Sequence, residues 1–301
     1  MSDYLITKFH TYLLTEKRVA SNTFSAYKRD IDQFMTYLAS RKVTLDSVTI
    51  ADVKEFLRHM KDTLCLSARS ITRKISSLKV LFSYMHEHLG LPNVAEDLIF
   101  PKVEKNLPNY LNEQEVQQLL MAANHDQTDI GVRNKVIVYL LYVSGMRVSE
   151  LINVQLSHLH FDTGFIDVLG KGGKMRMVPV PAPMLTLLQE YLNTVHGTFT
   201  KNGSRSTDYL FPIFYAGKIK PITRQAVWVI LNQLCKKSGL NRTVFPHQLR
   251  HSLATHMFKN GVDLRSLQML LGHETIATVQ IYTHVETSHL RKVYDKKHPR
   301  S

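Results

Sequence analysis

A phenol stands among imidazoles near the end of this chain, in the stretch GHETIATVQIYTHV. Tyr282 lies nine residues after His273 and two residues before His284. Tyrosine is one of the residues whose side chain acts as a covalent nucleophile, and histidine is the most common general base that accepts the proton of such a nucleophile. Tyr282 and His273 are therefore the first two candidates for chemistry.

Four more candidates precede them in the sequence. Two of these, Arg147 and Lys171, are basic residues that lie next to a predicted helix end or turn. Arg147 follows the helix stop at Ser144 and Gly145. We expect it to begin a new helix, where backbone N–H groups also favour anions. Lys171 lies in the glycine-rich turn KGGK, whose glycines let the backbone approach a ligand closely. A lysine in a surface turn usually has no role, so Lys171 is not persuasive alone.

The remaining two candidates, His247 and Arg250, are three residues apart in HQLRH. On a helix this spacing puts both side chains on one face, where they can address one group. His247, His251 and His256 also have spacings of four and five that occur among zinc ligands. No HExxH motif and no nearby cysteine accompanies them, so we predict no metal.

The composition suits a nucleic-acid partner. The formal net charge is +13 and the pI is about 9.6, although a merely basic solvated surface has the same composition. Apolar runs such as residues 136–143 are far shorter than a membrane span, and no signal peptide is evident, so we predict a cytoplasmic protein without membrane insertion. Cys65 and Cys235 are too few for a disulfide framework and are interpreted as ordinary thiols.

Apolar spacing predicts two domains in a mainly α chain with a small β-sheet in the second domain. Residues 1–90 are predicted as an N-terminal helical bundle, with Ser21 or Asn22, Thr49 and Ser67 as helix caps. Residues 91–111 contain three prolines and are predicted as a linker. Residues 112–301 are predicted as a mixed α/β catalytic domain, in which FIDVLG and MRMVPVP are two strands joined by the KGGK turn and the rest is helical.

The motifs GMRVSEL, LGKGGK, HQLRHSLATHM and LGHETIATVQIYTHV occur in this order and resemble those of the tyrosine site-specific recombinases, the integrase family. The likeness extends over nearly the whole chain, and its ending HLRKVYDKKHPRS is similar to the branch that resolves chromosome dimers. The resemblance implies a SAM-like core-binding domain followed by the catalytic domain. It also implies cutting and rejoining of duplex DNA through a 3′-phosphotyrosine intermediate and a Holliday junction, with no cofactor and no metal.

The resemblance also implies a role for each candidate residue. Tyr282 is the nucleophile, and Arg147 and Arg250 hold the non-bridging oxygens of the scissile phosphate, where fork-shaped guanidiniums bind better than a lysine does. Lys171 is the general acid for the departing 5′ hydroxyl. His247 accepts the tyrosine proton, and His273 hydrogen-bonds the phosphate. Glu150, three residues after Arg147, is either an orienting partner of that arginine or a solvated charge.

The implied partner is double-stranded DNA at a specific recombination site, bound by a recombinase tetramer on two sites. The tetramer contains four copies of this chain or two copies each of it and a related recombinase, and a DNA translocase is a candidate activator. The C-terminal segment 289–301 is expected to dock into a neighbouring protomer. Alternatives that stay open are a mobile-element integrase, a non-catalytic DNA-binding regulator and a type IB topoisomerase-like enzyme. Basic or amide side chains that face DNA are predicted at two helices: Arg69, Arg73, Lys74, Arg224 and Gln225.

Overall fold

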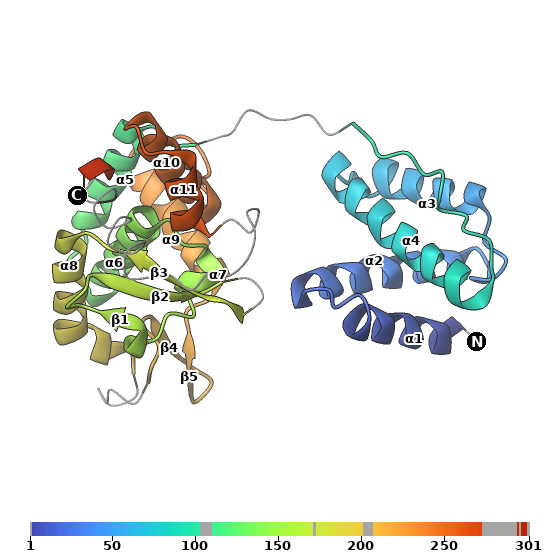
Figure 1. Cartoon of the computed structure of the whole chain (residues 1–301), viewed down its shortest axis with the longest axis horizontal. Helices are drawn as coiled ribbons and strands as arrows, with labels where there is room; N and C mark the ends of the chain where they lie inside the picture. Colours follow the sequence, from blue (N-terminus) through green and yellow to red (C-terminus); the bar gives the residue numbers. More distant parts are fainter. Residues whose placement is uncertain are drawn as a thin grey trace. The chain divides into compact units, whose positions relative to one another are not determined.

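A computed structural model describes residues 2–102, 110–170, 173–200, 207–272, 294 and 296–299. The chain forms two compact units, Met1–Asn106 and Leu107–Ser301. Figure 1 shows the first as a group of helices and the second as helices around small sheets, so the predicted fold class is confirmed. The border between the units falls inside the segment predicted as a linker.

Four helices build the first unit: α1 (Ser2–Thr15), α2 (Ser21–Ser40), α3 (Ile50–Asp62) and α4 (Ala68–Leu89). Two predicted caps are confirmed, because the side chains of Thr49 and Ser67 accept hydrogen bonds from backbone N–H groups of the first turns of α3 and α4. The predicted cap of α2 is wrong. That helix already includes Ser21, and Ala20 precedes it without a side-chain hydrogen bond.

The core of the first unit is aromatic, with the Phe34 ring in edge contact with Phe56 and Phe82. Ala95 and Leu98 are also buried in this core, although both belong to the segment predicted as a linker. The chain therefore stays packed on the first unit beyond the end of α4, because these two side chains bury apolar surface there.

In the second unit, α6 packs against α5, α8, α9 and α10, and its run 136–143 is apolar on all sides. Buried residues cover most of its length, as the run at 136–143 predicted. The helices are α5 (Glu113–Asn124), α6 (Asp129–Ser144), α7 (Val148–Leu151), α8 (Ala182–Thr194), α9 (Arg224–Lys237), α10 (Pro246–Lys259) and α11 (Leu264–Leu271), with 3-10 turns at Leu156–His158 and His196–Phe199.

The helix predicted to begin at Arg147 is a single turn, α7, with Arg147 at its N-cap position. So short a helix has a small dipole, and we attribute no anion binding to it. The residues that follow form the 3-10 turn and the first strand instead of continuing the helix. In the described part of the chain, no helix has both the length and the apolar character that crossing a membrane requires.

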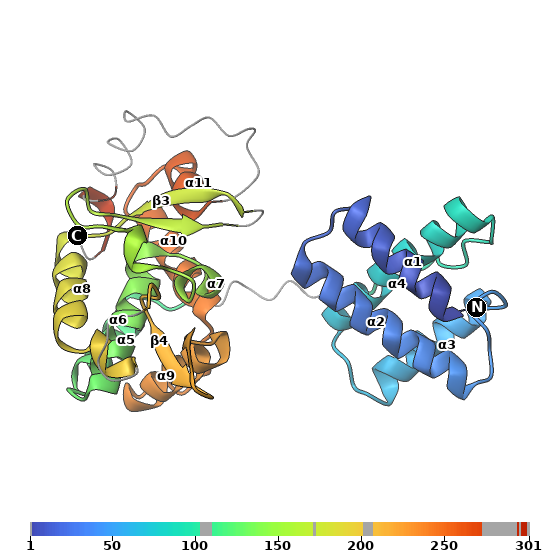
Figure 2. The ribbon, with the colours of Figure 1, turned by 90° about the horizontal axis from the view of Figure 1, so that it is seen from below.

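The described part of the second unit also contains two small antiparallel sheets (Figures 1 and 2). One has the order β1 (Leu159–His160), β2 (Phe165–Leu169) and β3 (Met175–Pro179), which confirms both predicted strands; the other is the hairpin of β4 (Pro212–Tyr215) and β5 (Lys218–Pro221). The β4–β5 hairpin was missed, since the sequence was expected to be helical here. Its turn has positive φ at Ala216 and Gly217, 50° and 74°, and only the glycine of that pair is a sequence signal.

Candidate active site

Arg147 lies at the N-cap of α7 and is held by Glu150, one helical turn later. Its Nη1 donates to Glu150 Oε1 at 2.8 Å, and its backbone N–H donates to Oε2 at 2.6 Å. The side chain of Glu150 is 3% exposed, whereas that of Arg147 is 36% exposed. Glu150 is therefore an orienting partner, and Arg147 keeps an accessible guanidinium.

A second arginine, Arg176 of β3, binds the same carboxylate and was not found from the sequence. Its Nη1 donates to Glu150 Oε1 at 2.9 Å and its Nη2 to Oε2 at 2.8 Å, and its side chain is 6% exposed. A weak signal was present: Arg176 has the same parity along the strand as Val178 and Val180, which face the core. A charge at an inward position of a strand requires a buried partner.

These two arginines control the charge of Glu150. Burial by itself raises the pKa of this carboxyl, but the hydrogen bonds and positive charge of Arg176, followed by the hydrogen bonds of Arg147, lower it to about 2. Glu150 is consequently ionised at neutral pH, and its negative charge holds both guanidiniums in place.

Arg250, on α10, is fully inside the unit at 3% exposure. Its Nη1 donates to the carbonyl of Gly145 at 2.7 Å, and its Nη2 donates to the carbonyl of Leu271. Burial, then the nearby positive charge of Arg147, lowers the pKa of Arg250 to about 10, so the guanidinium stays charged. Two carbonyls from distant segments thus fix its plane and leave other N–H groups for a ligand.

His247 begins the same helix and is exposed on its surface. Partial burial, followed by the positive charges of Arg250, His251 and Arg147, lowers the pKa of His247 below its ordinary value of 6.5. Its imidazole is therefore neutral at pH 7 and able to accept a proton. Arg147 is brought close to His247 and Arg250 here, although the sequence separates it from them by about one hundred residues.

The described part of the site carries a net positive charge. The guanidiniums of Arg147 and Arg176 bind the carboxylate of Glu150, and that of Arg250 interacts with it electrostatically. Three positive charges and one negative charge give +3 − 1 = +2 with His247 neutral. A phosphodiester carries one negative charge and has two non-bridging oxygens that suit fork-shaped donors. The arrangement is thus an anion site that is only partly neutralised by its own carboxylate.

Lys171, His273 and Tyr282 lie outside the described residues, so their roles stay predictions. Two described glycines adjoin them in the sequence. Gly170 donates from its backbone N–H to the carbonyl of Lys174 at 2.7 Å, and Gly272 ends α11 with φ of 62°. Both lie near the Arg176 side chain, as described below.

The histidines that were weighed as metal ligands do different work. His256 is 1% exposed, and its Nδ1 is 2.9 Å from the hydroxyl of Tyr142, which makes it a core residue of the α6–α10 interface. Within the described ranges, no three His, Cys, Asp or Glu side chains form a group that suits a metal ion.

Of the residues predicted to face DNA, Lys74 is the one that the structure places in a core. It is 2% exposed, and its Nζ donates to Asp30 of α2 at 2.9 Å. Lys74 therefore ties α4 to α2, and its ammonium is not at the surface. Arg73 also binds Asp30 but has an exposed side chain, and Arg69 is exposed. Of the three α4 residues predicted to face DNA, Arg69 and Arg73 are therefore exposed, and their contact with DNA stays a prediction.

Arg224 and Gln225 are exposed at the first two positions of α9. One turn later the Trp228 ring stacks on Phe245, with ring centroids 6.3 Å apart. Since Phe245 is two residues before His247, the beginning of α9 adjoins the beginning of α10. Arg224 and Gln225 thus lie on the side of the unit where His247 emerges.

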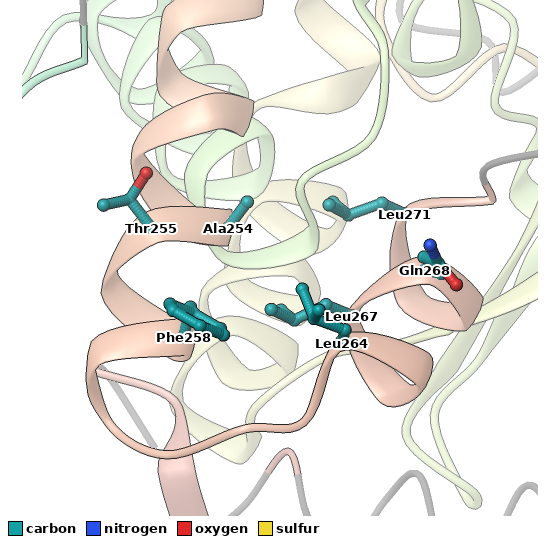
Figure 3. A pocket seen from close by; sticks show the side chains of 7 residues that line it. All are labelled: Ala254, Thr255, Phe258, Leu264, Leu267, Gln268 and Leu271. Carbon is teal, nitrogen blue, oxygen red and sulfur yellow. The ribbon is translucent and has the colours of Figure 1, made fainter. Parts of the chain in front are cut away.

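An apolar groove of about 350 Å³ lies between α10 and α11 (Figure 3). Phe258, Leu264 and Leu267 line it, and no ionisable side chain does. Leu271 contributes its side chain to this groove while its carbonyl accepts from Arg250. The groove is therefore separate in chemistry from the phosphate-directed side chains.

The described part of the C-terminal segment packs on its own chain. Tyr294 is fully buried, and its hydroxyl donates to the carbonyl of Val143 at 2.6 Å. Asn260, at the end of α10, donates to the carbonyl of Lys297 at 3.2 Å. The resemblance implied docking into a neighbouring protomer; in this single chain Tyr294 contacts α6, and Lys297 contacts the end of α10.

Both units have counterparts in known protein families. Residues 109–289 match the phage integrase family, and residues 6–88 match the phage integrase N-terminal SAM-like domain. The first match alone covers more than half of the chain. The chain belongs to the phage integrase family. It is accordingly a tyrosine recombinase, an enzyme that acts on DNA.

Individual recombinases resemble it over most or all of their length. The tyrosine recombinases XerD of Listeria innocua and Staphylococcus aureus are each 36% identical to it, over 99% of this chain and 99% of theirs. The structure of the XerH site-specific recombinase bound to its difH substrate is 26% identical, with a TM-score of 0.66 over 89% of this chain and 78% of that one. A lambda integrase dimer on a core site shares the fold at 19% identity, with a TM-score of 0.67 over 93% and 98%.

Proposed function

We propose that this recombinase resolves chromosome dimers by exchanging strands between two copies of one DNA site. The observation that carries the catalytic part is the pair of arginines, Arg147 and Arg176, on one buried carboxylate. The buried Arg250 and the neutral His247 interact electrostatically with Arg147 of this pair. The full-length likeness to XerD recombinases supports the biological part.

The reaction begins at the scissile phosphate. The phenolic oxygen of Tyr282 bonds to phosphorus, and the bond from phosphorus to the 5′ oxygen breaks. His247 takes the phenolic proton, and Lys171 gives a proton to the departing 5′ oxygen. Arg147 and Arg250 stabilise the charge that builds on the non-bridging oxygens, and His273 donates to one of them.

The phosphotyrosine bond conserves the energy of the broken phosphodiester. The 5′ hydroxyl of the partner duplex then attacks it, and the phenol leaves, so no ATP is consumed. One exchange of this kind yields a Holliday junction and a second resolves it. Two duplexes are therefore required, which fits a tetramer built from this chain alone or with a related recombinase.

The test of the nucleophile uses DNA fragments that are selected by their binding to the protein. Chromosomal fragments that bind the Tyr282→Phe protein are made into nicked suicide duplexes and incubated with wild type and with the variant. A denaturing gel should show a covalent adduct with wild type only, and EDTA should leave it unchanged. An adduct with both proteins contradicts the assignment of Tyr282.

The general acid has a separate test. Lys171→Ala should cleave slowly on an ordinary phosphodiester and recover on a 5′-phosphorothiolate, because a thiolate leaves without protonation. His247→Ala should not recover in this way, since its proposed role is at the nucleophile. Equal recovery of both variants would place the general acid elsewhere.

Dimer resolution and mobile-element integration differ in where the bound site occurs. One site per chromosome suffices for resolution, because a dimer then contains two copies in the same orientation. We expect the selected fragments to map to one chromosomal place, and a plasmid with two direct copies to be resolved. Fragments that map to the ends of a mobile element would favour the integrase alternative.

A further inference from the structure

We propose that Arg176 is a positioning residue of the recombination reaction, which sets Arg147 through their shared partner Glu150 and joins three segments of the active site. This inference rests on the proposed phosphate chemistry. Arg176 is assigned no contact with DNA; it acts through other residues.

The shared carboxylate is the basis of this role. Each oxygen of Glu150 accepts two hydrogen bonds, one from Arg147 and one from Arg176, at 2.6 to 2.9 Å. The two terminal nitrogens of Arg176 face the two oxygens, so the guanidinium and the carboxylate are held in one plane. The orientation of Glu150, and with it the position of Arg147, therefore depends on Arg176.

The backbone also approaches the Arg176 side chain closely at two glycines, Gly170 and Gly272. A Cβ on Gly272 would be 2.9 Å from its Nε, and a Cβ on Gly170 would be 3.4 Å from its Nη1. Gly170 precedes Lys171, and Gly272 precedes His273. A side chain at position 272 would therefore collide with the buried guanidinium, whereas one at position 170 would lie at about contact distance from it.

Charge balance gives the reason for a second arginine. With Arg147 alone, the single negative charge of Glu150 would neutralise the guanidinium that must bind phosphate. Arg176 shares that charge, so that Arg147 keeps part of its positive field. Its buried Nε has no hydrogen-bond partner among the described residues, an uncompensated polar group that packing alone does not explain.

The experiment compares cleavage with binding. Arg176→Met, Arg176→Lys, Glu150→Gln and the double variant Arg176→Met/Glu150→Gln are assayed on the nicked suicide duplex under single-turnover conditions. Lys236→Met, at an exposed position near the end of α9, is the control for the loss of one positive charge. Gel shifts give the Kd for the same duplex, and thermal melts by circular dichroism report folding.

Arg176→Met is expected to cleave on the order of 10 to 100 times more slowly than wild type, since misplacing a binding group lowers the rate by such factors. Its Kd should change less than about threefold, because most of the affinity comes from other phosphate contacts. Arg176→Lys should recover part of the rate. The double variant should be about as slow as the slower single variant, because both changes break one unit.

Three results would overturn the inference: wild-type rates in folded Arg176→Met, an equal loss in Kd and cleavage, or independent effects that multiply in the double variant. If Arg176→Met does not fold, Arg176→Lys decides, since it keeps the charge but not the two-pronged geometry. Absence of adduct with the wild-type protein refutes the proposed chemistry instead, so the two failures are distinguishable.

Discussion

Replacing Glu150 by glutamine should remove stability that depends on pH. The pKa of Glu150 is lowered from 4.5 to about 2 by Arg176 and Arg147 against the effect of burial. Each pKa unit corresponds to about 1.4 kcal/mol, so the ionised carboxylate contributes about 3 kcal/mol to the stability of the second unit. The side chain is 3% exposed, and solvent therefore screens this interaction little.

The sign of the pH dependence follows from the depressed pKa. The contribution is fully present above pH 4.5, the unfolded value, and is lost as the pH falls towards about 2. The difference in unfolding free energy between wild type and Glu150→Gln should thus be about 3 kcal/mol at pH 7 and shrink as the pH decreases through that window.

Urea unfolding followed by tryptophan fluorescence measures this difference. Trp228 is the single tryptophan of the sequence and lies in α9, so its emission reports the second unit. Glu190→Gln, at an exposed position of α8, is the matched control and should change stability by less than about 0.5 kcal/mol. A difference for Glu150→Gln that is equal at all pH values, or equal to that of the control, would refute the reasoning.

Three further predictions concern other residues of the second unit. Gly145→Ala should destabilise the second unit by about 1 to 3 kcal/mol in the same urea assay. The φ angle of Gly145 is 60°, and the new Cβ would be 2.8 Å from the Leu253 side chain. Unchanged stability would contradict this close packing. The rate of DNA cleavage should fall on acidification with a midpoint below pH 6.5, because partial burial and neighbouring cations lower the pKa of His247. A midpoint above pH 6.5 would contradict this. Tyr294→Phe should cost about 1 to 3 kcal/mol in urea unfolding, because the carbonyl of Val143 loses its buried donor; a loss below about 0.5 kcal/mol would show that water replaces it.

Local features were predicted well because they depend on neighbours in the sequence. The helix caps at Thr49 and Ser67 each place a side-chain oxygen at the start of an apolar repeat. The i,i+3 pair of Arg147 and Glu150 has the same local origin.

Two of the failures, at Lys74 and Arg176, have a common cause in contacts between distant segments, and the third has a local one. Lys74 looks like any basic residue of a surface helix, and only the packing of α4 on α2 brings its ammonium to Asp30. Arg176 has no acidic neighbour along its strand, and its partner Glu150 comes from α7. The β4–β5 hairpin was missed because its turn depends on Ala216, which rarely adopts positive φ.

By itself, the sequence determined which chemical groups this chain carries and in which order: guanidiniums, imidazoles and a phenol. Their motifs lie on helices and a hairpin that have strong local signals. Tertiary structure decided how those groups share charge. It brought two arginines, Arg147 and Arg176, to one buried carboxylate. It oriented a third, Arg250, by hydrogen bonds to the carbonyls of Gly145 and Leu271. Burial and electrostatic interaction depend on distance in space, and the order of residues along the chain does not contain that distance.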